Sequence, residues 1–283
     1  MPEGDTIYRT AHALQKAIGG KVVTAFETQL AMLASVHDDK LLIGRTTVEK
    51  VEARGKWCLI SFSDDLILVT HMRMSGSWHI YRTGETWWIG RNRMRVAITC
   101  GDYQVVAFNA PIAKFYTALS LDRNSQIPKL GPDILSDNFT VAKAVESLRS
   151  YAAYHPESEV AVTLLNQRVM AGLGNVYKSE VAFAAGVNPF RPMRTITPPE
   201  MQSIADIAQR YLKANIASGT REGMVTYAGN RRTTHSMDRT DRLRVYGRQG
   251  QECRRCGAII EMRKQGEQAR PTYWCPSCQV YCG

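Results

Sequence analysis

The sequence lacks any run of about 18 apolar residues, so no segment is typical of a membrane-spanning helix, and we expect no membrane partner. It also lacks the cationic start and apolar core of a secretory signal, since it begins Met-Pro-Glu-Gly-Asp. We therefore expect a cytoplasmic protein with reduced cysteines. Internal repeats and low-complexity tracts are absent, which excludes solenoids and largely disordered chains. The 283 residues are 44% hydrophobic and 22% charged, a composition typical of a globular chain with two domains.

Acidic residues are in the minority. The chain has 36 Lys and Arg residues against 26 Asp and Glu residues, a formal net charge of +10. Residues 221–283 carry most of this excess, with 12 basic and 6 acidic residues. Such a balance favours a polyanionic partner, and nucleic acid is favoured over a membrane because no basic amphipathic helix accompanies the charge. A basic surface with no such partner is the alternative.

Hydrophobic periodicity separates a β-rich first part from a helical second part. A helical pattern over Asp5–Ile18 predicts one short N-terminal helix. The next hundred residues contain eight short β-rich runs, which predict an antiparallel sandwich or barrel. These runs are Val22–Val23, Thr46–Val51, Trp57–Phe62, Leu66–Thr70, Ser77–Tyr81, Trp87–Trp88, Val96–Thr99 and Val105–Phe108.

The second part begins after a turn-rich stretch, Asp122–Asn138, which is typical of a linker. Thr220–Val245 is polar, basic and without periodicity, so we expect a loop there. Helical periodicity predicts four helices between these two stretches, at Val141–Tyr151, Val160–Met170, Val176–Ala185 and Pro199–Ile216.

Four of the seven cysteines form two closely spaced pairs separated by eighteen residues. This spacing is typical of a zinc ribbon, in which two knuckles joined by a hairpin complete a tetrahedral site. All four ligands come from the protein, so the metal has a structural role and no position is open to water. Coincidence or disulfide bonding is the alternative, which a reducing compartment disfavours. The expected ligands are Cys253, Cys256, Cys275 and Cys278.

Two further features suit phosphate binding. Arg270 lies between the two cysteine pairs, where a guanidinium held near a metal anchor can bind a phosphate in a bidentate manner. A solvated surface arginine is the alternative. The segment Gly172-Leu173-Gly174-Asn175 separates two predicted helices, and we expect Asn175 to cap the second helix, whose free amides would face an anion. An ordinary capped helical hairpin is the alternative.

The N-terminal residues form a third candidate site. Initiator Met is normally removable before Pro, and its removal would expose a secondary amine on Pro2. A terminal amine titrates near pH 8, so a sizeable neutral fraction is available to attack a carbon centre and form an iminium. Glu3 beside it offers a carboxylate for proton transfer. A frayed terminus of no consequence is the alternative.

In this order, these features resemble one family, the bacterial Fpg/Nei DNA glycosylases, which include formamidopyrimidine-DNA glycosylase and endonuclease VIII. The resemblance covers nearly the whole chain. Five motifs carry it: Pro2-Glu3-Gly4 resembles the endonuclease VIII form of the opening, Arg54-Gly55-Lys56 the hairpin lysine, His71-Met72-Arg73-Met74-Ser75-Gly76 the void-filling loop, Gly174-Asn175 the helix-two-turns-helix clamp, and Arg270 with the four cysteines the zinc finger.

The resemblance implies an α+β fold with two domains. We expect an N-terminal antiparallel β-sandwich with an N-terminal helix, followed by a helical helix-two-turns-helix domain that carries a zinc-ribbon β-hairpin finger. The expected boundaries are 1–121 for the catalytic domain, 122–138 for the linker, 139–245 for the helical DNA-binding domain with its flexible loop, and 246–283 for the zinc finger.

The resemblance also implies a bifunctional glycosylase and AP lyase of base-excision repair. In such enzymes the residue matching Pro2 attacks C1′ of a flipped nucleotide, and the iminium promotes β- and then δ-elimination. Glu3 is then the general acid and base, and Met74 fills the vacated stack. Lys56, which also belongs to the catalytic set, binds the flanking phosphates together with Asn175 and Arg270. One structural Zn²⁺, no redox or nucleotide cofactor, damaged DNA as partner and a monomeric state are expected.

The chain departs from the family pattern in ways that bear on the lesion. Thr6 stands where many relatives have a second Glu, and Asp5 is the nearest carboxylate. Residues 109–116 lack the Arg-Phe-Gly of the 8-oxoguanine enzymes. Together with Gly4, the absence of this motif favours oxidised pyrimidines as the substrate, whereas Met74 is typical of the branch of the family that acts on purines. An 8-oxoguanine and formamidopyrimidine glycosylase is therefore one alternative, and a non-catalytic zinc-ribbon DNA-binding protein with a degenerate active site is the other.

Overall fold

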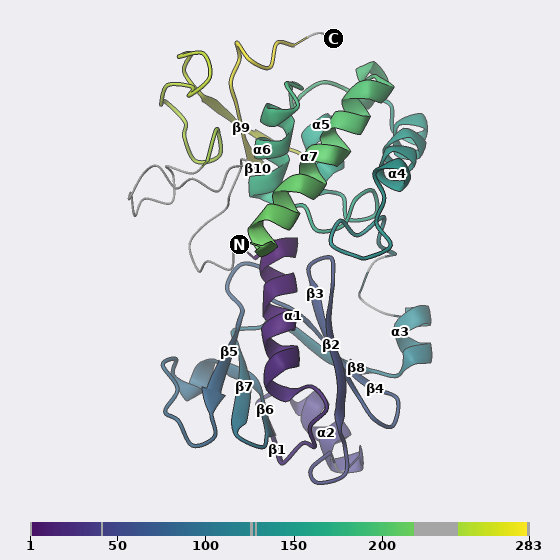
Figure 1. Ribbon diagram of the computed structural model, residues 1–283, viewed down its shortest axis with the longest axis vertical. Helices are drawn as coiled ribbons and strands as arrows, with labels where there is room; N and C mark the ends of the chain where they lie inside the picture. The colour runs from purple at the N-terminus through teal and green to yellow at the C-terminus, as the bar shows by residue number, and fades with distance from the viewer. Residues whose placement is uncertain (1, 41, 125–126, 128, 218–242, 282–283) are drawn as a thin grey trace. The chain divides into compact units, whose positions relative to one another are not determined.

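The computed structural model describes residues 2–40, 42–124, 127, 129–217 and 243–281 (Figure 1). The expected loop Thr220–Val245 lies outside the described residues except for its last three positions. The chain divides into two compact units, Met1–Pro128 and Lys129–Gly283, which are taken in turn below. Among the described helices, none has the length and apolar character needed to cross a membrane.

The first unit is built on two four-stranded sheets whose neighbouring strands are all antiparallel. One sheet has the order β2-β3-β4-β8 and the other the order β1-β6-β7-β5. The strands of the first sheet are β2 (Val48–Arg54), β3 (Trp57–Phe62), β4 (Leu66–His71) and β8 (Ile112–Tyr116). Those of the second are β1 (Ala25–Thr28), β5 (Ser77–Arg82), β6 (Met94–Cys100) and β7 (Tyr103–Phe108).

A single core lies between the sheets and is completed by helix α1 (Gly4–Ile18). Alternate residues of each strand face this core, as Ile60 and Phe62 do on β3. The helix contributes a stripe at the expected spacing, including Ile7 and Leu14, and packs against β2 and β3. The predicted antiparallel sandwich with an N-terminal helix is confirmed.

The strands are apolar on their other faces too, because each outer face has a cover. Val106 and Phe108 of β7 pack beneath the connection before β6, where Trp87 contacts Phe108 with ring centroids 5.6 Å apart. On the other sheet, Trp57 and Leu121 join a cluster that brings in helix α3 (Ala118–Asn124). The near-continuous apolar runs of the sequence reflect this double coverage.

Two of the eight predicted strands are wrong. Val22 forms only an isolated bridge to Thr47, and the strand begins after it, at β1. Trp87 and Trp88 form no strand, although aromatic residues favour strands. The Trp87 indole N–H instead donates to Gln104 Oε1 (2.8 Å), so this pair covers a sheet without joining it. The sequence also did not predict β8, α3, helix α2 (Ala31–Lys40) or the 3₁₀ turn at Arg91–Arg93.

The second unit begins with helices around one core, as predicted. They are α4 (Val141–Tyr154), α5 (Val160–Leu165), α6 (Asn175–Ala184) and α7 (Pro198–Ala217). Two short 3₁₀ turns also occur in the chain, η1 (Arg91–Arg93) in the first unit and η2 (Met193–Thr195) in the second. Helix α5 ends five residues before its predicted end at Met170, because the chain turns twice between Asn166 and Gly174.

The unit ends with an antiparallel hairpin of β9 (Glu261–Gln265) and β10 (Arg270–Trp274). Cysteine pairs flank the hairpin on both sides, and β10 packs against α6. A small core joins the hairpin region to that helix and contains Phe183, Val245 and Ile260. The predicted fold class, a sandwich followed by a helical domain with a ribbon hairpin, is therefore confirmed.

Candidate functional site

Pro2 and Glu3 directly precede helix α1. Pro2 is half-buried, and Glu3 is only 3% exposed although it stands next to the end of the chain. Glu3 is the N-cap residue, and its carbonyl accepts from the N–H of Ile7 (3.1 Å). Its side chain makes no capping hydrogen bond, so the carboxylate is not committed to the helix end. A fixed helix thus holds a buried carboxylate beside Pro2.

The neighbouring acid, Asp5, has partners of its own. One oxygen lies 3.6 Å from Arg9 Nη2, one turn along the helix, and the other accepts from the Thr6 hydroxyl at 3.5 Å. Asp5 is 6% exposed. The carboxylate therefore belongs to a buried network on α1.

Lys56 lies at the tip of the hairpin between β2 and β3. Arg54 pairs with Trp57, so the loop consists of Gly55 and Lys56 alone. Gly55 has φ of 57°, and only glycine adopts this region readily at the first position of such a tight turn. The pairing of β2 with β3 therefore fixes the backbone that carries the half-buried Lys56.

His71 lies beside Lys56 at the end of β4. It pairs with Trp57, and the two ring centroids are 4.6 Å apart. Burial, together with the charges of Lys56 and Arg73, lowers the pKa of His71 to about 4. The Nδ1 atom accepts from the Arg73 N–H (3.0 Å), so the neutral ring carries its proton on Nε2. At neutral pH this imidazole is an uncharged donor next to a cation.

Met74 is presented by the turn that follows His71. It is 71% exposed, whereas Met72 is buried and anchors the turn. The Gly76 N–H donates to the Met72 carbonyl (2.9 Å), and a Cβ on Gly76 would lie 2.9 Å from that same oxygen. Glycine is required there for steric reasons. An apolar side chain on a tight, anchored turn is suited to enter a gap in a base stack.

Asn175 is the first residue of α6, and Gly174 rather than Asn175 is the cap residue. The expectation that Asn175 caps the helix is thus wrong. Its side chain is instead nearly buried, with Nδ2 3.4 Å from the hydroxyl oxygen of Tyr246. The Oδ1 atom is buried without a hydrogen-bond partner among the described residues. An orphan polar atom at a helix N-terminus is typical of a site that awaits a ligand.

The buried carboxylate of Glu180 holds the backbone that carries Tyr246. It accepts from the N–H groups of Arg244 (2.9 Å), Val245 (2.9 Å) and Tyr246 (2.8 Å). Burial raises the pKa of Glu180, and the three amide donors oppose that shift. Sequence reasoning missed this residue, although an acid within the apolar pattern of Val176–Ala185 was a usable signal.

The four cysteines come together as expected. Their sulfur atoms all lie within 4.8 Å of one another, with Cys253 and Cys278 at 3.9 Å and Cys256 and Cys275 at 3.4 Å. A tetrahedral zinc with bonds of about 2.3 Å requires sulfurs about 3.8 Å apart. Hydrogen bonds from the Ala258 backbone and from the neighbouring thiols lower the pKa of Cys256 to about 7, whereas burial raises the pKa of Cys275 and of Cys278. Cys256 is thus the thiol that ionises first, and a bound metal would favour the thiolate form of the other ligands. The cluster therefore fits a metal ion.

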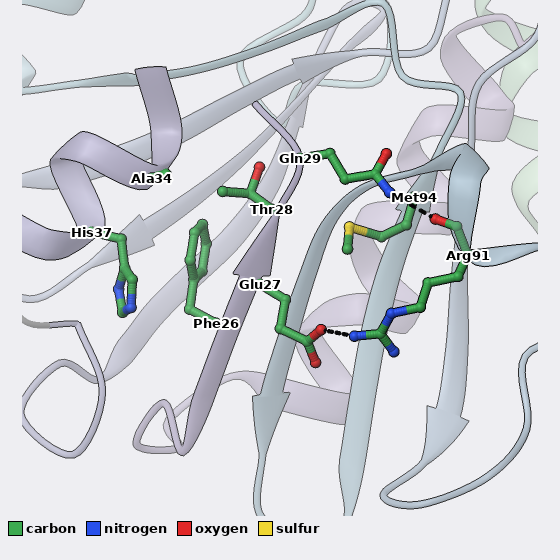
Figure 2. Close-up of a pocket in the computed structure, with 8 residues that line it drawn as sticks. All are labelled: Phe26, Glu27, Thr28, Gln29, Ala34, His37, Arg91 and Met94. Atoms are coloured by element: carbon green, nitrogen blue, oxygen red, sulfur yellow. Dashed lines mark hydrogen bonds and ion pairs between the residues drawn. The ribbon is translucent and has the colours of Figure 1, made fainter. Parts of the chain in front are cut away.

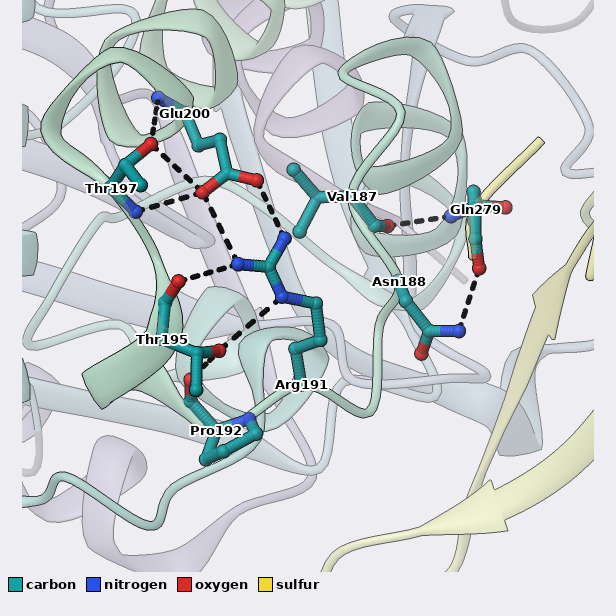
Figure 3. A network of polar contacts seen from close by, with 8 residues as sticks. All are labelled: Val187, Asn188, Arg191, Pro192, Thr195, Thr197, Glu200 and Gln279. Atoms are coloured by element: carbon teal, nitrogen blue, oxygen red, sulfur yellow. Dashed lines mark hydrogen bonds and ion pairs between the residues drawn. The ribbon is translucent and has the colours of Figure 1, made fainter. Parts of the chain in front are cut away.

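The second cysteine pair is fastened to the helical core by Gln279. Its Nε2 donates to the Val187 carbonyl (2.8 Å), and its own carbonyl accepts from Asn188 Nδ2 (2.7 Å), as Figure 3 shows. The Gln279 Oε1 atom accepts from the Cys275 N–H (3.0 Å). All these groups are buried, so the knuckle has a fixed position on this unit.

Arg270 begins β10, directly after the loop of four residues that closes the hairpin. Gln268 Oε1 accepts from its Nε (3.1 Å) and Nη2 (2.8 Å), which orients the half-buried guanidinium. Further along β10, the Tyr273 ring lies 5.0 Å from the Tyr246 ring. Because Tyr246 contacts Asn175, a chain of contacts links β10 to the start of α6.

Comparison with known proteins gives two family models that together cover most of the chain. The formamidopyrimidine-DNA glycosylase N-terminal domain matches residues 1–112, and the formamidopyrimidine-DNA glycosylase H2TH domain matches residues 130–225. The chain belongs to the Fpg/Nei family. Among its relatives, DNA-(apurinic or apyrimidinic site) lyase Nei2 of Mycolicibacterium smegmatis is 33% identical, and the match covers 99% of each chain. Endonuclease 8 of Escherichia coli is 31% identical, over 99% of this chain and all of the relative.

A solved structure shows the same fold. An Fpg mutant of Lactococcus lactis, in complex with a Fapy-dG containing DNA, matches with a TM-score of 0.79 over 99% of this chain and 100% of that one. At 23% identity this likeness concerns the fold alone. The expected Fpg/Nei site residues fall into two groups: Pro2, Glu3, Lys56 and Met74 lie in the first unit, and Asn175, Arg270 and the four cysteines in the second.

One pocket of this Fpg/Nei protein contains none of the expected site residues. It has a volume of about 410 Å³ and lies between α2, β1 and the turn η1 in the first unit (Figure 2). Arg91 pairs with Glu27 at this pocket, and the Arg91 carbonyl accepts from Gln29 Nε2 (3.0 Å). The charges of Arg91 and Glu27 are thus balanced within the lining, whereas the buried Nδ1 atom of His37 has no hydrogen-bond partner among the described residues.

Proposed function

We propose that this protein is a base-excision-repair DNA glycosylase and AP lyase that removes oxidised pyrimidines. One observation carries the proposal: in a chain that belongs to the Fpg/Nei family, Pro2 and the buried Glu3 stand at the head of a rigid helix. Relatives that match the full chain are named endonuclease 8 and apurinic or apyrimidinic site lyase. The activity of those relatives is carried to this chain as part of the proposal.

The proposed chemistry begins with loss of Met1, which frees the secondary amine of Pro2. The neutral amine attacks C1′ of the damaged nucleotide, the bond to the base breaks, and the base departs with a proton. The C1′–O4′ bond of the sugar then breaks, O4′ takes a proton from Glu3, and C1′ becomes the carbon of an iminium with the Pro2 nitrogen. This iminium acidifies C2′, so that loss of the C2′ proton expels the 3′ phosphate and a second elimination expels the 5′ phosphate. Glu3 is the acid and base of the proton transfers.

The phosphates beside the flipped nucleotide are held by Lys56, Asn175 and Arg270 in this proposal. Extrusion of a base costs a few kcal/mol, and fixed phosphate contacts offset part of that cost. Lys56 on its tight turn and Arg270 on its hairpin are pre-oriented cations, which lowers the entropy lost on binding. The exposed Met74 occupies the vacated space in the stack.

The bound metal in this proposal is one structural zinc. Cys253, Cys256, Cys275 and Cys278 hold it, and all four positions come from protein. The ion supplies no step of the reaction; it fixes the two knuckles from which the hairpin with Arg270 extends. We also propose that the protein acts as a monomer and that it works in the cytoplasm.

Borohydride trapping tests the proposed nucleophile. Reduction turns the iminium into a stable amine, so the mature protein should become covalently attached to DNA that contains an abasic site. A chain that retains Met1 keeps every side chain but has no amine on Pro2, and it should give no adduct. Glu3→Gln should still bind DNA while losing excision of the damaged base. Adduct formation by the chain that retains Met1, or by none of the forms, would show that Pro2 is not the nucleophile.

The lesion preference is tested with duplexes that carry dihydrouracil, thymine glycol or 8-oxoguanine. We expect faster excision of the two pyrimidines. Preferred excision of 8-oxoguanine would instead favour the Fpg-type alternative, in agreement with the exposed Met74. A protein that binds all three duplexes without cleavage and without trapping would be a DNA-binding protein with a degenerate site.

A further inference from the structure

The second unit contains a pocket rich in aromatic side chains that the proposed function leaves unused. Its volume is about 540 Å³, within the range of pockets that bind small molecules. It lies where the hairpin of β9 and β10 meets the start of α5 and the segment between α6 and η2. None of the residues proposed to hold the lesion or the zinc lines it. The lining includes Glu159, Asn188, Phe190, Arg263, Trp274 and Tyr281.

Buried hydrogen bonds fix the walls of this pocket. Asn188 Nδ2 donates to the Gln279 carbonyl (2.7 Å), which holds the chain two residues before Tyr281 (Figure 3). Gln265 Nε2 donates to Glu159 Oε2 (2.6 Å) and so ties the hairpin to the start of α5. Asn188, Gln265 and Gln279 are all buried. The walls therefore need little reordering when a ligand enters, which lowers the entropy lost on binding.

The aromatic rings of the pocket differ in how much surface they leave for a ligand. Phe190 is buried, and its ring lies 4.7 Å from that of Trp274 in an edge-to-face arrangement. The Arg263 guanidinium lies over the Phe190 ring, 3.7 Å from its centroid. Phe190 is thus used by contacts within the protein. Trp274 is only half-buried and Tyr281 is 57% exposed, so these two rings have surface that a ligand can cover.

The charges of the pocket cancel. Glu159 and Arg263 are the charged residues of its described lining, and they form an ion pair with Oε1 and Nη2 3.8 Å apart. An ion of either sign is therefore not favoured. The separation is too long for a hydrogen bond, so the carboxylate can still accept and the guanidinium can still donate. Such a pocket suits a neutral, flat ligand whose edge carries both donors and acceptors.

The hairpin connects this pocket to the proposed DNA contact at Arg270. Arg270 and Trp274 begin and end β10, so their side chains lie on the same face of the hairpin, about 13 Å apart along the strand. One strand of DNA is long enough to contact both. Nucleobases are neutral and flat, and their edges carry donors and acceptors. In a duplex these edges are paired and the faces are stacked, so only an unpaired base can enter.

We propose that the pocket of Trp274 and Tyr281 binds an unpaired nucleobase of single-stranded DNA, an inference that rests on the proposed function in that Arg270 holds the same strand. The base stacks on the two exposed aromatic rings. Every base has a π-face, so stacking alone accepts any of the four. Glu159 and Arg263 bond the edge of the stacked base.

The test uses the full-length, zinc-loaded chain with two undamaged probes, an oligothymidylate single strand and the same strand annealed to oligoadenylate. Trp274→Ala and Tyr281→Ala each remove one ring. Tyr154→Ala is the matched control, because it removes an 84% exposed tyrosine from the end of α4 in the same unit. Trp274→Phe keeps an aromatic face, which covers the case in which Trp274→Ala does not fold. Affinities are measured at several salt concentrations.

Trp274→Ala and Tyr281→Ala should each weaken single-strand binding about tenfold relative to Tyr154→Ala. The slope of log affinity against log salt concentration should not change, because a stacked base carries no charge. Duplex binding should match the control, because paired bases do not reach the pocket. Trp274→Phe should keep single-strand affinity within about twofold of the parent.

The proposal is overturned if both alanine variants bind the single strand as Tyr154→Ala does, or if they weaken single-strand and duplex binding by the same factor. A parent chain with no single-strand affinity also overturns it. Proline-rich peptides are the other ligands that aromatic-lined pockets accept. Decaproline binding that requires Trp274, with no effect of Trp274→Ala on single-strand affinity, would assign the pocket to such a peptide instead. Neither probe contains a lesion, so a failure of the glycosylase assignment shows as absent excision and leaves these comparisons intact.

Discussion

Lys56 and Arg270 carry the charge of the proposed phosphate contacts, whereas Asn175 is neutral. Each sits on a backbone that a short turn or a helix start holds in place. Phosphate contacts carry no information about the base, so loss of any of them should weaken binding to every lesion alike. The charged and neutral residues should differ only in how salt affects that loss.

Lys56→Ala and Arg270→Ala should each lower the affinity for DNA. Each should also reduce the slope of log affinity against log salt concentration by about one. Asn175→Ala should lower affinity with little change in slope, since no cation is lost and the protein still offers the α6 amides. Affinity titrations at two salt concentrations, run beside melting curves, distinguish these effects. If Arg270 is only a solvated hairpin residue, Arg270→Ala will bind like the parent; if Asn175 has only a structural role, Asn175→Ala will lose thermal stability instead.

The candidate site residues that the sequence offers all belong to short motifs, whereas residues that act through distant backbone escaped the sequence analysis. Cys253 and Cys256 are separated by two residues, and this spacing alone indicates a metal. Glu180 meets its partners Arg244–Tyr246 only after more than sixty intervening residues, so no local pattern reveals the contact. His71 stood within a recognised motif, but its low pKa depends on burial and on Lys56, which lies across a strand pair. Long-range electrostatics of this kind are not encoded by spacing.

Helices and strands with a clear hydrophobic periodicity were predicted well. Elements whose existence or end depends on contacts with other parts of the fold were not. Helix α1 shows an apolar stripe with Ile7 and Leu14 in the core. Among residues 31–38 of helix α2, Leu33 alone is fully buried and Met32 is 70% exposed, so this part of the helix shows no apolar stripe to detect. The end of α5 was also missed because Gln167 terminates it from outside the helix: its side chain bonds the Leu165 and Leu173 carbonyls, both at 2.9 Å.

The start of helix α7 is a capping box whose effect on stability can be measured. The Thr197 N–H donates to Glu200 Oε2 (2.8 Å), and the Glu200 N–H donates back to the Thr197 hydroxyl (3.4 Å). Arg191 Nη1 also donates to Glu200 (2.6 Å), as Figure 3 shows. Thr197→Ala removes one side of the box and should lower the free energy of unfolding by about 1 kcal/mol. Thr140→Ala at the cap of α4 is a matched control, since Thr140 has a cap bond but no acidic partner.

The capping box of Thr197 and Glu200 also predicts that the stability of the protein depends on pH. Burial alone would raise the pKa of Glu200, but hydrogen bonds from Arg191 and Thr197 outweigh it, so the pKa lies below its ordinary value. The unfolded chain then binds the proton more tightly, and the stabilisation is present above the ordinary pKa and lost as the pH falls through the folded one. Glu200→Gln should therefore show a shallower loss of stability than the parent between about pH 5 and about pH 3. If the parent and Glu200→Gln lose the same amount of stability as the pH falls over this range, Glu200 does not have this role.

At the scale of the whole molecule, each unit has its own hydrophobic core, and the cysteine cluster belongs to the second. The proposed zinc should therefore support the hairpin and its contacts with α6 without affecting the sandwich. Four of the five tryptophans, including Trp57 and Trp78, lie in the first unit, so tryptophan fluorescence reports mainly on the sandwich. Metal loss and sandwich unfolding can thus be followed separately.

Protein purified without chelator should contain about one zinc per chain, and Cys253→Ser should lose it because three thiolates leave one position of the tetrahedral site open. We expect this variant to lose DNA binding, since Arg270 extends from a hairpin whose knuckles are no longer fixed, while the fluorescence melting curve of the sandwich stays close to that of the parent. Cys58→Ser is a matched control, because it alters a thiol in the sandwich core and leaves the cluster intact. It should keep its zinc and lower the sandwich melting temperature instead. A metal content near zero in the parent, or full DNA binding by Cys253→Ser, would remove the basis for a structural zinc that positions Arg270.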